Sequence, residues 1–174
     1  MNQAHWHLLL NHFPVVGTIL CLLLLIAGVL RKSEEWKRAG LSCLVLVALL
    51  AIPAYLTGEP AEGVIEHLPD VSESLIEPHE AAAKFAILAA LATGAVALFG
   101  LLRFRGPGAL PTWLMTVMLL MTAWTVAVMA QTANLGGKIR HTEVRAGFTP
   151  GGGAGAPEGR NEKGHEEEER KEKR

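Results

Sequence analysis

The chain has 174 residues, half of them hydrophobic, and a formal net charge of −1. Its charged residues concentrate in residues 151–174 while long stretches elsewhere carry none, a pattern that excludes the evenly charged surface of a soluble globular enzyme. The near-zero net charge also argues against a nucleic acid as the partner.

Four apolar blocks follow one another along the chain, and each is long enough to cross a membrane. A spanning helix needs about 20 apolar residues to cross roughly 30 Å of hydrocarbon. Because lipid offers the backbone no hydrogen-bond partner, the blocks are predicted to be helices. We expect an all-α polytopic membrane protein, a four-helix bundle within residues 1–148. The expected spans are about 8–30, 39–57, 80–102 and 112–135.

The first block is predicted to be an uncleaved span that begins outside the cell membrane. A signal peptide carries cations before its apolar run, but residues 1–12 contain neither Lys nor Arg. His12 lies within the apolar run, directly before Phe13 and Pro14. Polar residues at such depth are costly and often functional, so His12 is the first candidate ligand.

Charge in the connections predicts the orientation. Cations follow the first and third blocks, whereas residues 58–80 contain seven acidic residues and no Lys or Arg. Cytoplasmic loops are rich in cations, which places both termini in the periplasm and the protein in a bacterial inner membrane. Three cations near the end of the fourth block oppose this weakly. The inner cations are Arg31, Lys32, Lys37, Arg38, Arg103 and Arg105, and the opposing ones are Lys138, Arg140 and Arg145.

The two cysteines lie in the first two blocks. We expect Cys21 to lie mid-span and Cys43 to lie near the cytoplasmic end, several helical turns apart in depth. Such a separation is too large for a disulfide.

The third block begins with Pro78 and His79. Proline suits the first turn of a helix, which would place His79 at the outer end. Small residues continue below His79 at helical spacing, which favours close approach of a second helix over that of a flat macrocycle. They are Ala83, Ala86, Ala90, Gly94 and Ala97.

The fourth block ends at Gly136 and Gly137, which are predicted to cap the helix. The chain would then turn and bring His141 over the outer mouth of the bundle. Residues 149–174 are expected to be a disordered Gly-rich linker and charged tail, in which His165 is incidental.

Histidines on separate helices of a bundle are typical ligands of b-type haem. We predict His12 and His79 as the axial pair, with His7 and His141 as a second pair or as support. The cations expected to face the propionates are Lys84, Lys138 and Arg140.

Two other interpretations use the same residues. Zinc or copper suits imidazole and would bind His7, His12, His79 and Glu80. Alternatively, the histidines are interfacial, with an apolar body in lipid and a polar tip in water.

The predicted function is that of an integral membrane redox subunit with non-covalent haem b, which transfers one electron. The sequence contains no P-loop, GxSxG or HExxH motif, so an electron-transfer or accessory subunit is favoured over a stand-alone enzyme. Expected partners are the lipid bilayer, a quinone or periplasmic cytochrome, and a larger membrane complex. The alternative is a structural or zinc/copper-binding subunit of such a complex.

Several of these residues recur together in one protein family. His7, His12-Phe13-Pro14, Thr57-Gly58, His79 and Gly136-Gly137 occur in that order near the expected helix ends. In this pattern residues 5–145 resemble a family of small four-helix bacterial membrane proteins, domain of unknown function 2231. The chain differs where Leu8 replaces the family's proline and where His141 lies in a region that often has a tyrosine and a histidine. The resemblance implies a bacterial inner-membrane protein and a haem-linked redox role.

Overall fold

The computed structural model describes residues 2–148, in which helices predominate and no strand occurs. The predicted tail, residues 149–174, lies outside the described residues. In chain order the elements are α1 (Gln3–Leu10), α2 (His12–Leu30), α3 (Glu34–Leu56), α4 (Gly58–Ile65), α5 (Glu73–Arg103), α6 (Thr112–Arg140) and the 3₁₀ turn η1 (Thr142–Val144).

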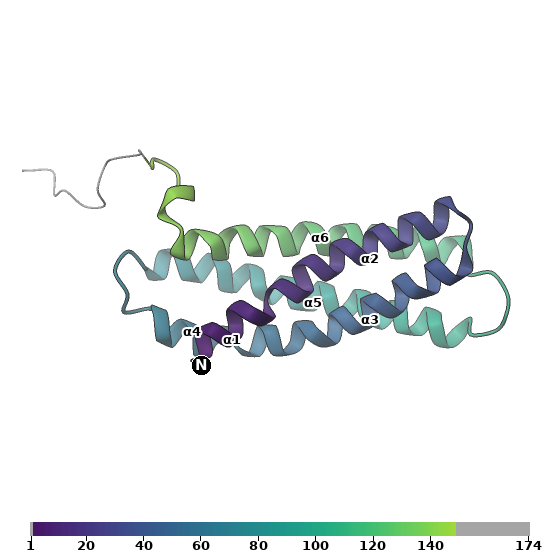
Figure 1. Cartoon of the computed structure of the whole chain (residues 1–174), viewed down its shortest axis with the longest axis horizontal. Coiled ribbons are helices and arrows are strands. Elements are labelled where there is room, and N and C mark those ends of the chain that lie inside the picture. The colour runs from purple at the N-terminus through teal and green to yellow at the C-terminus, as the bar shows by residue number, and fades with distance from the viewer. Residues whose placement is uncertain (1, 149–174) are drawn as a thin grey trace, which may run out of the picture.

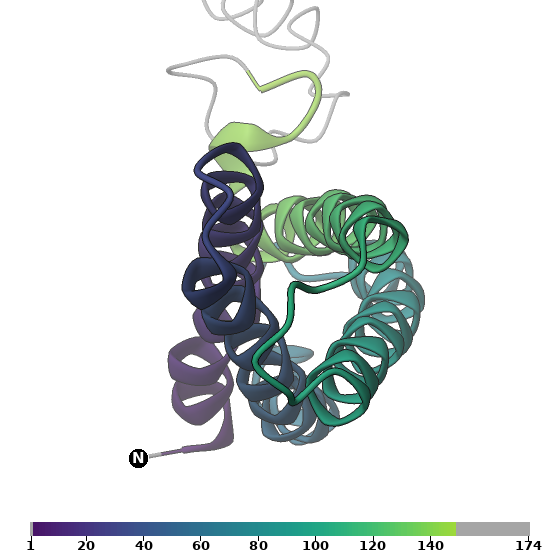
Figure 2. The ribbon, with the colours of Figure 1, turned by 90° about the vertical axis from the view of Figure 1, so that its right-hand side faces the viewer.

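The long helices α2, α3, α5 and α6 form an antiparallel bundle (Figure 1). Helix α2 packs on α3, α3 on α5, α5 on α6 and α6 on α2, which closes the ring seen end-on in Figure 2. Helix α1 precedes α2 and packs against α4 at the end where α6 finishes. We call this the histidine end. The opposite end, with the connections 31–33 and 104–111, is the turn end.

Four helical stretches are long and apolar enough to cross a membrane: Gln3–Leu30, Glu34–Ile65, Glu73–Arg103 and Thr112–Arg140. They confirm the predicted all-α membrane fold with four spanning helices. Each stretch extends past the predicted span because the helix continues into the polar residues at its ends. Large apolar side chains cover the outer faces, and Leu20, Leu49 and Trp124 are each more than half exposed, as lipid contact requires.

At the turn end, Glu34 and Arg38 at the start of α3 form hydrogen bonds with connection 104–111. The Glu34 carboxylate accepts from Lys37 Nζ and from the backbone N–H of Leu110, each at 2.7 Å. The Arg38 guanidinium donates to two carbonyls of connection 104–111, at 3.0 and 3.2 Å. These bonds hold α3 against the start of α6.

Two apolar cores differ in the size of their side chains. The core nearer the turn end contains large residues, among them Leu25, Leu41, Leu44, Leu114 and Met118. The core nearer the histidine end consists of Ala51, Ala86, Ala90 and Met129. The bundle is therefore filled by bulky side chains at one end and by alanines at the other.

The small residues of α5 serve helix packing. A Cβ atom on Gly94 would lie 2.4 Å from Cβ of Ala48 on α3, so a larger residue would separate the helices. Close approach of small residues is a main source of helix association in lipid. The interpretation favoured from the sequence is confirmed at this position.

The predicted separation of the cysteines is wrong. The α2–α3 connection at residues 31–33 is short. Cys21 lies as many residues before residue 31 as Cys43 lies after residue 33. In an antiparallel hairpin, equal distances from the turn mean equal depth. Cys21 and Cys43 consequently belong to the same apolar core, Cys21 as a buried member and Cys43 packed against it.

Two predicted helix boundaries are also wrong. Helix α5 begins at Glu73, so Pro78 lies inside the helix rather than in its first turn. Helix α6 continues through Gly136 and Gly137 and ends at Arg140. Gly136 therefore serves a purpose other than capping, which its contacts with His79 explain below.

Candidate functional site

All six histidines of the described residues lie at the histidine end. They are His5 and His7 on α1, His12 at the start of α2, His67 after α4, His79 on α5 and His141 after α6. Their common location was predicted from the sequence, but their environments differ and separate two of them from the rest.

His7 is half-buried and is held by the end of α3. Its Nδ1 lies 3.0 Å from the carbonyl oxygen of Ala54 and 3.2 Å from Oγ1 of Thr57. The Thr57 hydroxyl donates to the carbonyls of Pro53 and Ala54, so its oxygen is an acceptor for His7. Carbonyls in the last turn of a helix have no intrahelical N–H partner. The end of α3 at Leu56 thus makes the Ala54 carbonyl available to the imidazole.

Gly58 begins α4 directly after this contact. A Cβ on Gly58 would lie 3.7 Å from Cε1 of His7, which places the α3–α4 junction against the imidazole ring. From the sequence the Thr57-Gly58 pair was identified only as part of the family pattern. Its contact with His7 depends on the packing of α1 against α3 and α4.

His79 is half-buried and is held by α6. Its Nδ1 lies 3.0 Å from the carbonyl oxygen of Thr132. Its ring lies over Gly136, where a Cβ atom would be 2.9 Å from Cε1 and 3.1 Å from Nδ1. Real Cβ atoms essentially never approach so closely, so a glycine is required beneath the ring.

These contacts define the protonation of both imidazoles. A main-chain carbonyl can only accept a hydrogen bond, so Nδ1 of His7 and Nδ1 of His79 carry the proton. In the neutral ring, Nε2 then has a free lone pair, the form in which histidine binds metals. Both rings lie at the histidine end, His7 against α3 and His79 against α6.

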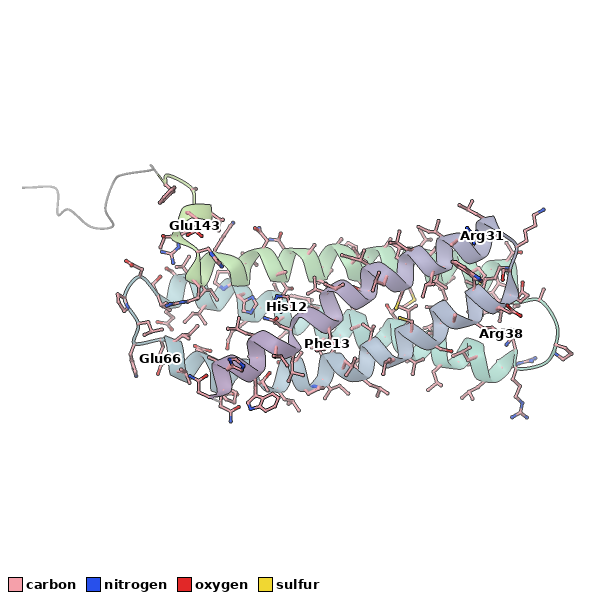
Figure 3. All side chains as sticks on the ribbon, in the orientation of Figure 1. His12, Phe13, Arg31, Arg38, Glu66 and Glu143 are labelled. Carbon is pink, nitrogen blue, oxygen red and sulfur yellow. The ribbon has the colours of Figure 1, made fainter. Side chains whose placement is uncertain are left out.

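His12 is not part of this pair. Its side chain is exposed, and its Nδ1 lies 2.7 Å from the carbonyl oxygen of Leu8 in the preceding turn (Figure 3). His12 lies five residues after His7, which directs the two side chains to different sides of the helix. His7 and His79 are each held by another helix, α3 and α6 respectively, whereas His12 bonds to the preceding turn of its own helix.

His141 is exposed beyond the end of α6. Its Nδ1 lies 2.7 Å from Oε1 of Glu143. The pKa of the Glu143 carboxyl is held below its usual value, first by its own backbone N–H and then by His141. His141 is therefore not held by another helix as His7 and His79 are.

The predicted cations lie near the pair but differ in exposure. Lys138 is half-buried and Arg140 is exposed, both in the last turn of α6. Lys84 is exposed and its Nζ lies 3.8 Å from a carboxylate oxygen of Glu80. All three come from the two helices, α5 and α6, that hold His79.

Carboxyl groups form the outer border of the site. Glu80 follows His79 on α5, and Glu62 lies on α4, which packs against α1. Glu62, Thr57 and Thr132 were not predicted from the sequence as neighbours of the histidines. The polar face of the short segment 58–65 was the available signal for Glu62. Thr132 acts through its carbonyl, which no side-chain pattern can reveal.

Among residues 2–148 no group of three or more His, Cys, Asp or Glu side chains is placed to hold one metal ion. The arrangement instead offers two nitrogen ligands on separate helices.

The comparison with family models identifies the same part of the chain. The model described as "Predicted membrane protein (DUF2231)" matches residues 5–144 and includes every residue of the site. No curated protein and no solved structure matches the chain. Because the match covers most of the chain and the structure has four candidate membrane spans, the chain belongs to the DUF2231 family of predicted membrane proteins.

Proposed function

We propose that the chain is an integral membrane redox subunit in which His7 and His79 are the axial ligands of a non-covalent b-type haem. The observation that carries this proposal is the shared hydrogen bonding of the two imidazoles. In each ring Nδ1–H donates to a main-chain carbonyl of a neighbouring helix, which leaves Nε2 free.

The residues present fit this group. A haem iron takes four nitrogens from the porphyrin, so two protein ligands complete its coordination. The Nδ1–H bonds fix the orientation of each ring and raise the basicity of Nε2, as outer hydrogen bonds do for metal-ligating histidines. Gly58 and Gly136 are small neighbours of the two rings. Lys138 and Arg140 supply cations for the propionates.

Each contact has a separate role. Thr57 is a positioning residue, because its oxygen accepts from His7 and its hydroxyl donates to the last turn of α3. Gly136 is a positioning residue for His79 because it leaves space for the ring. When bound, haem supplies a reversible one-electron couple.

The distribution of charge supports an orientation with the histidine end in the periplasm of a bacterial inner membrane. Cations concentrate at the turn end, where Arg31 and Arg38 lie (Figure 3), and acids concentrate at the histidine end, where Glu66 lies. Both termini would then be periplasmic. This places the haem within reach of a periplasmic cytochrome or a quinone of the outer leaflet, alone or within a larger complex.

The test is an absorption spectrum of the purified full chain, oxidised and then reduced with dithionite. We expect sharp reduced bands and about one haem per chain. His7→Ala and His79→Ala should each abolish the bands, because one axial ligand is lost. His12→Ala is the matched control and should keep them, because His12 is exposed and bonded to its own chain.

Two results would overturn the proposal. One is a colourless protein that retains zinc or copper by elemental analysis, which favours a metal-binding subunit. The other is loss of the bands in His12→Ala with retention in His7→Ala, which favours the pair predicted from the sequence.

A further inference from the structure

The second cluster of reactive side chains lies between α2 and α3, away from the histidines. Cys21 is fully buried and Cys43 is half-buried, and neither forms a disulfide. Both belong to one apolar core, in which Cys21 is buried and Cys43 packs against it.

The register of the two helices supports this placement independently. Close contacts run from Gly28 against Lys37, through Leu25 against Gly40, to Gly17 against Val47. Each step back along α2 is matched, to within one residue, by a step forward along α3. Within this register Cys21 falls opposite Cys43.

The glycines also bring the backbones close together. A Cβ on Gly28 would lie 2.8 Å from the backbone nitrogen of Lys37, and one on Gly17 would lie 2.6 Å from Cγ2 of Val47. The cysteines lie between these two contacts, where α2 and α3 are held together on both sides. A bond between the sulfurs is therefore compatible with the packing of the helices.

The surroundings decide which chemistry the pair can perform. The core around the thiols is apolar, with Leu25, Leu44 and Met118 among its members. A metal ion held by the two thiolates would lack further ligands, because among residues 2–148 no third His, Cys, Asp or Glu joins the pair. Disulfide formation converts two neutral thiols into a neutral product and leaves no charge behind.

We propose that Cys21 and Cys43 are a redox-active dithiol that closes to a disulfide by reducing a membrane quinone. Both S–H bonds break and one S–S bond forms. The two electrons and two protons pass to the two carbonyl oxygens of the quinone, which becomes a quinol. A quinone dissolves in the bilayer, and half-buried Cys43 offers it an approach. This site is independent of the histidine pair.

The experiment uses the reduced full chain in lipid nanodiscs with decylubiquinone, a fully substituted quinone that does not alkylate thiols. Free thiols are counted with a maleimide after denaturation, and the intact mass is measured. We expect both thiols to be lost together, the mass to fall by two hydrogen atoms, one quinol to form per chain, and dithiothreitol to reverse the change.

The matched control exchanges two neighbours, Ser42→Cys together with Cys43→Ser. Ser42 is exposed, so its replacement presents a more accessible thiol that faces away from Cys21. This variant should keep both thiols and its mass. His7→Ala should react as the unmodified chain does. The proposal is overturned if the thiols of the unmodified chain stay free, or if the exchanged variant closes an intramolecular disulfide equally well.

Discussion

The turn end and the histidine end of the bundle are built differently. At the turn end, large apolar side chains fill the space between helices, and Glu34 and Arg38 hydrogen-bond to connection 104–111. At the histidine end, alanines fill the space, and the imidazoles of His7 and His79 bond to main-chain carbonyls of neighbouring helices.

This difference separates stability from binding. Lipid tails are as apolar as leucine, so helices in a membrane associate by packing and by hydrogen bonds. The turn end concentrates both kinds of contact, in its core of large apolar side chains and in the hydrogen bonds of Glu34 and Arg38. The histidine end uses side chains that keep a lone pair at Nε2. We therefore expect stability to depend on the turn end and ligand binding to depend on the histidine end.

The largest expected effect tests the turn-end core. Leu25 is fully buried against Gly40, so Leu25→Ala should lower the free energy of unfolding by about 2–5 kcal/mol through lost contacts and a cavity. Leu23 is 56% exposed, and Leu23→Ala should change this free energy by no more than about 0.5 kcal/mol. Unfolding in mixed detergent and SDS micelles measures both. Equal losses in the two variants would contradict the described core.

The next effect tests the glycine beneath His79. Gly136→Ala places a methyl group against the ring and should cost about 1–3 kcal/mol by overpacking. A Cβ on Gly137 would have no atom within 4 Å, so Gly137→Ala should stabilise the helix by up to about 1 kcal/mol. The same unfolding assay, with haem content as a second readout, compares them. Similar behaviour of the two variants would show that the ring does not lie on Gly136.

A smaller effect tests the polar contacts of the turn end. Glu34→Gln weakens the bonds to Lys37 and to the Leu110 N–H, and partial exposure limits the loss to about 1 kcal/mol. Its exposed neighbour is the control, and Glu35→Gln should leave the unfolding curve unchanged. Haem content should be the same in both. A loss of haem in Glu34→Gln would contradict the expectation that ligand binding depends on the histidine end and not on the turn end.

The smallest effect concerns His141. Because its side chain is exposed and paired with Glu143, His141→Ala should change neither haem content nor stability at neutral pH. Because the pKa of Glu143 is lowered, any contribution of the His141–Glu143 pair to the free energy of unfolding is present at neutral pH. It is lost as the pH falls through the acid range. Spectra and unfolding curves at neutral and acid pH measure this. Loss of haem in His141→Ala would assign it to the ligand set.

Much of the fold followed from the sequence, but the choice of ligands did not. The apolar blocks predicted four spanning helices, and the histidines were predicted at one end of them. The sequence did not reveal which imidazoles contact another helix: His7 contacts α3 and His79 contacts α6, whereas His12 bonds to the preceding turn. The same holds for Gly136, which was predicted to cap a helix although it lies within one beneath His79.

The sequence alone determined that the chain crosses a membrane as four helices, because an apolar block of that length must satisfy its own backbone in lipid. Tertiary structure decided which side chains meet. Cys21 and Cys43 share one core because the short turn at residues 31–33 matches their depths. His7 and His79 are oriented by carbonyls of α3 and α6, far away in the chain, which accept hydrogen bonds from their Nδ1–H groups. Such contacts depend on the packing of whole helices and leave no local pattern in the sequence.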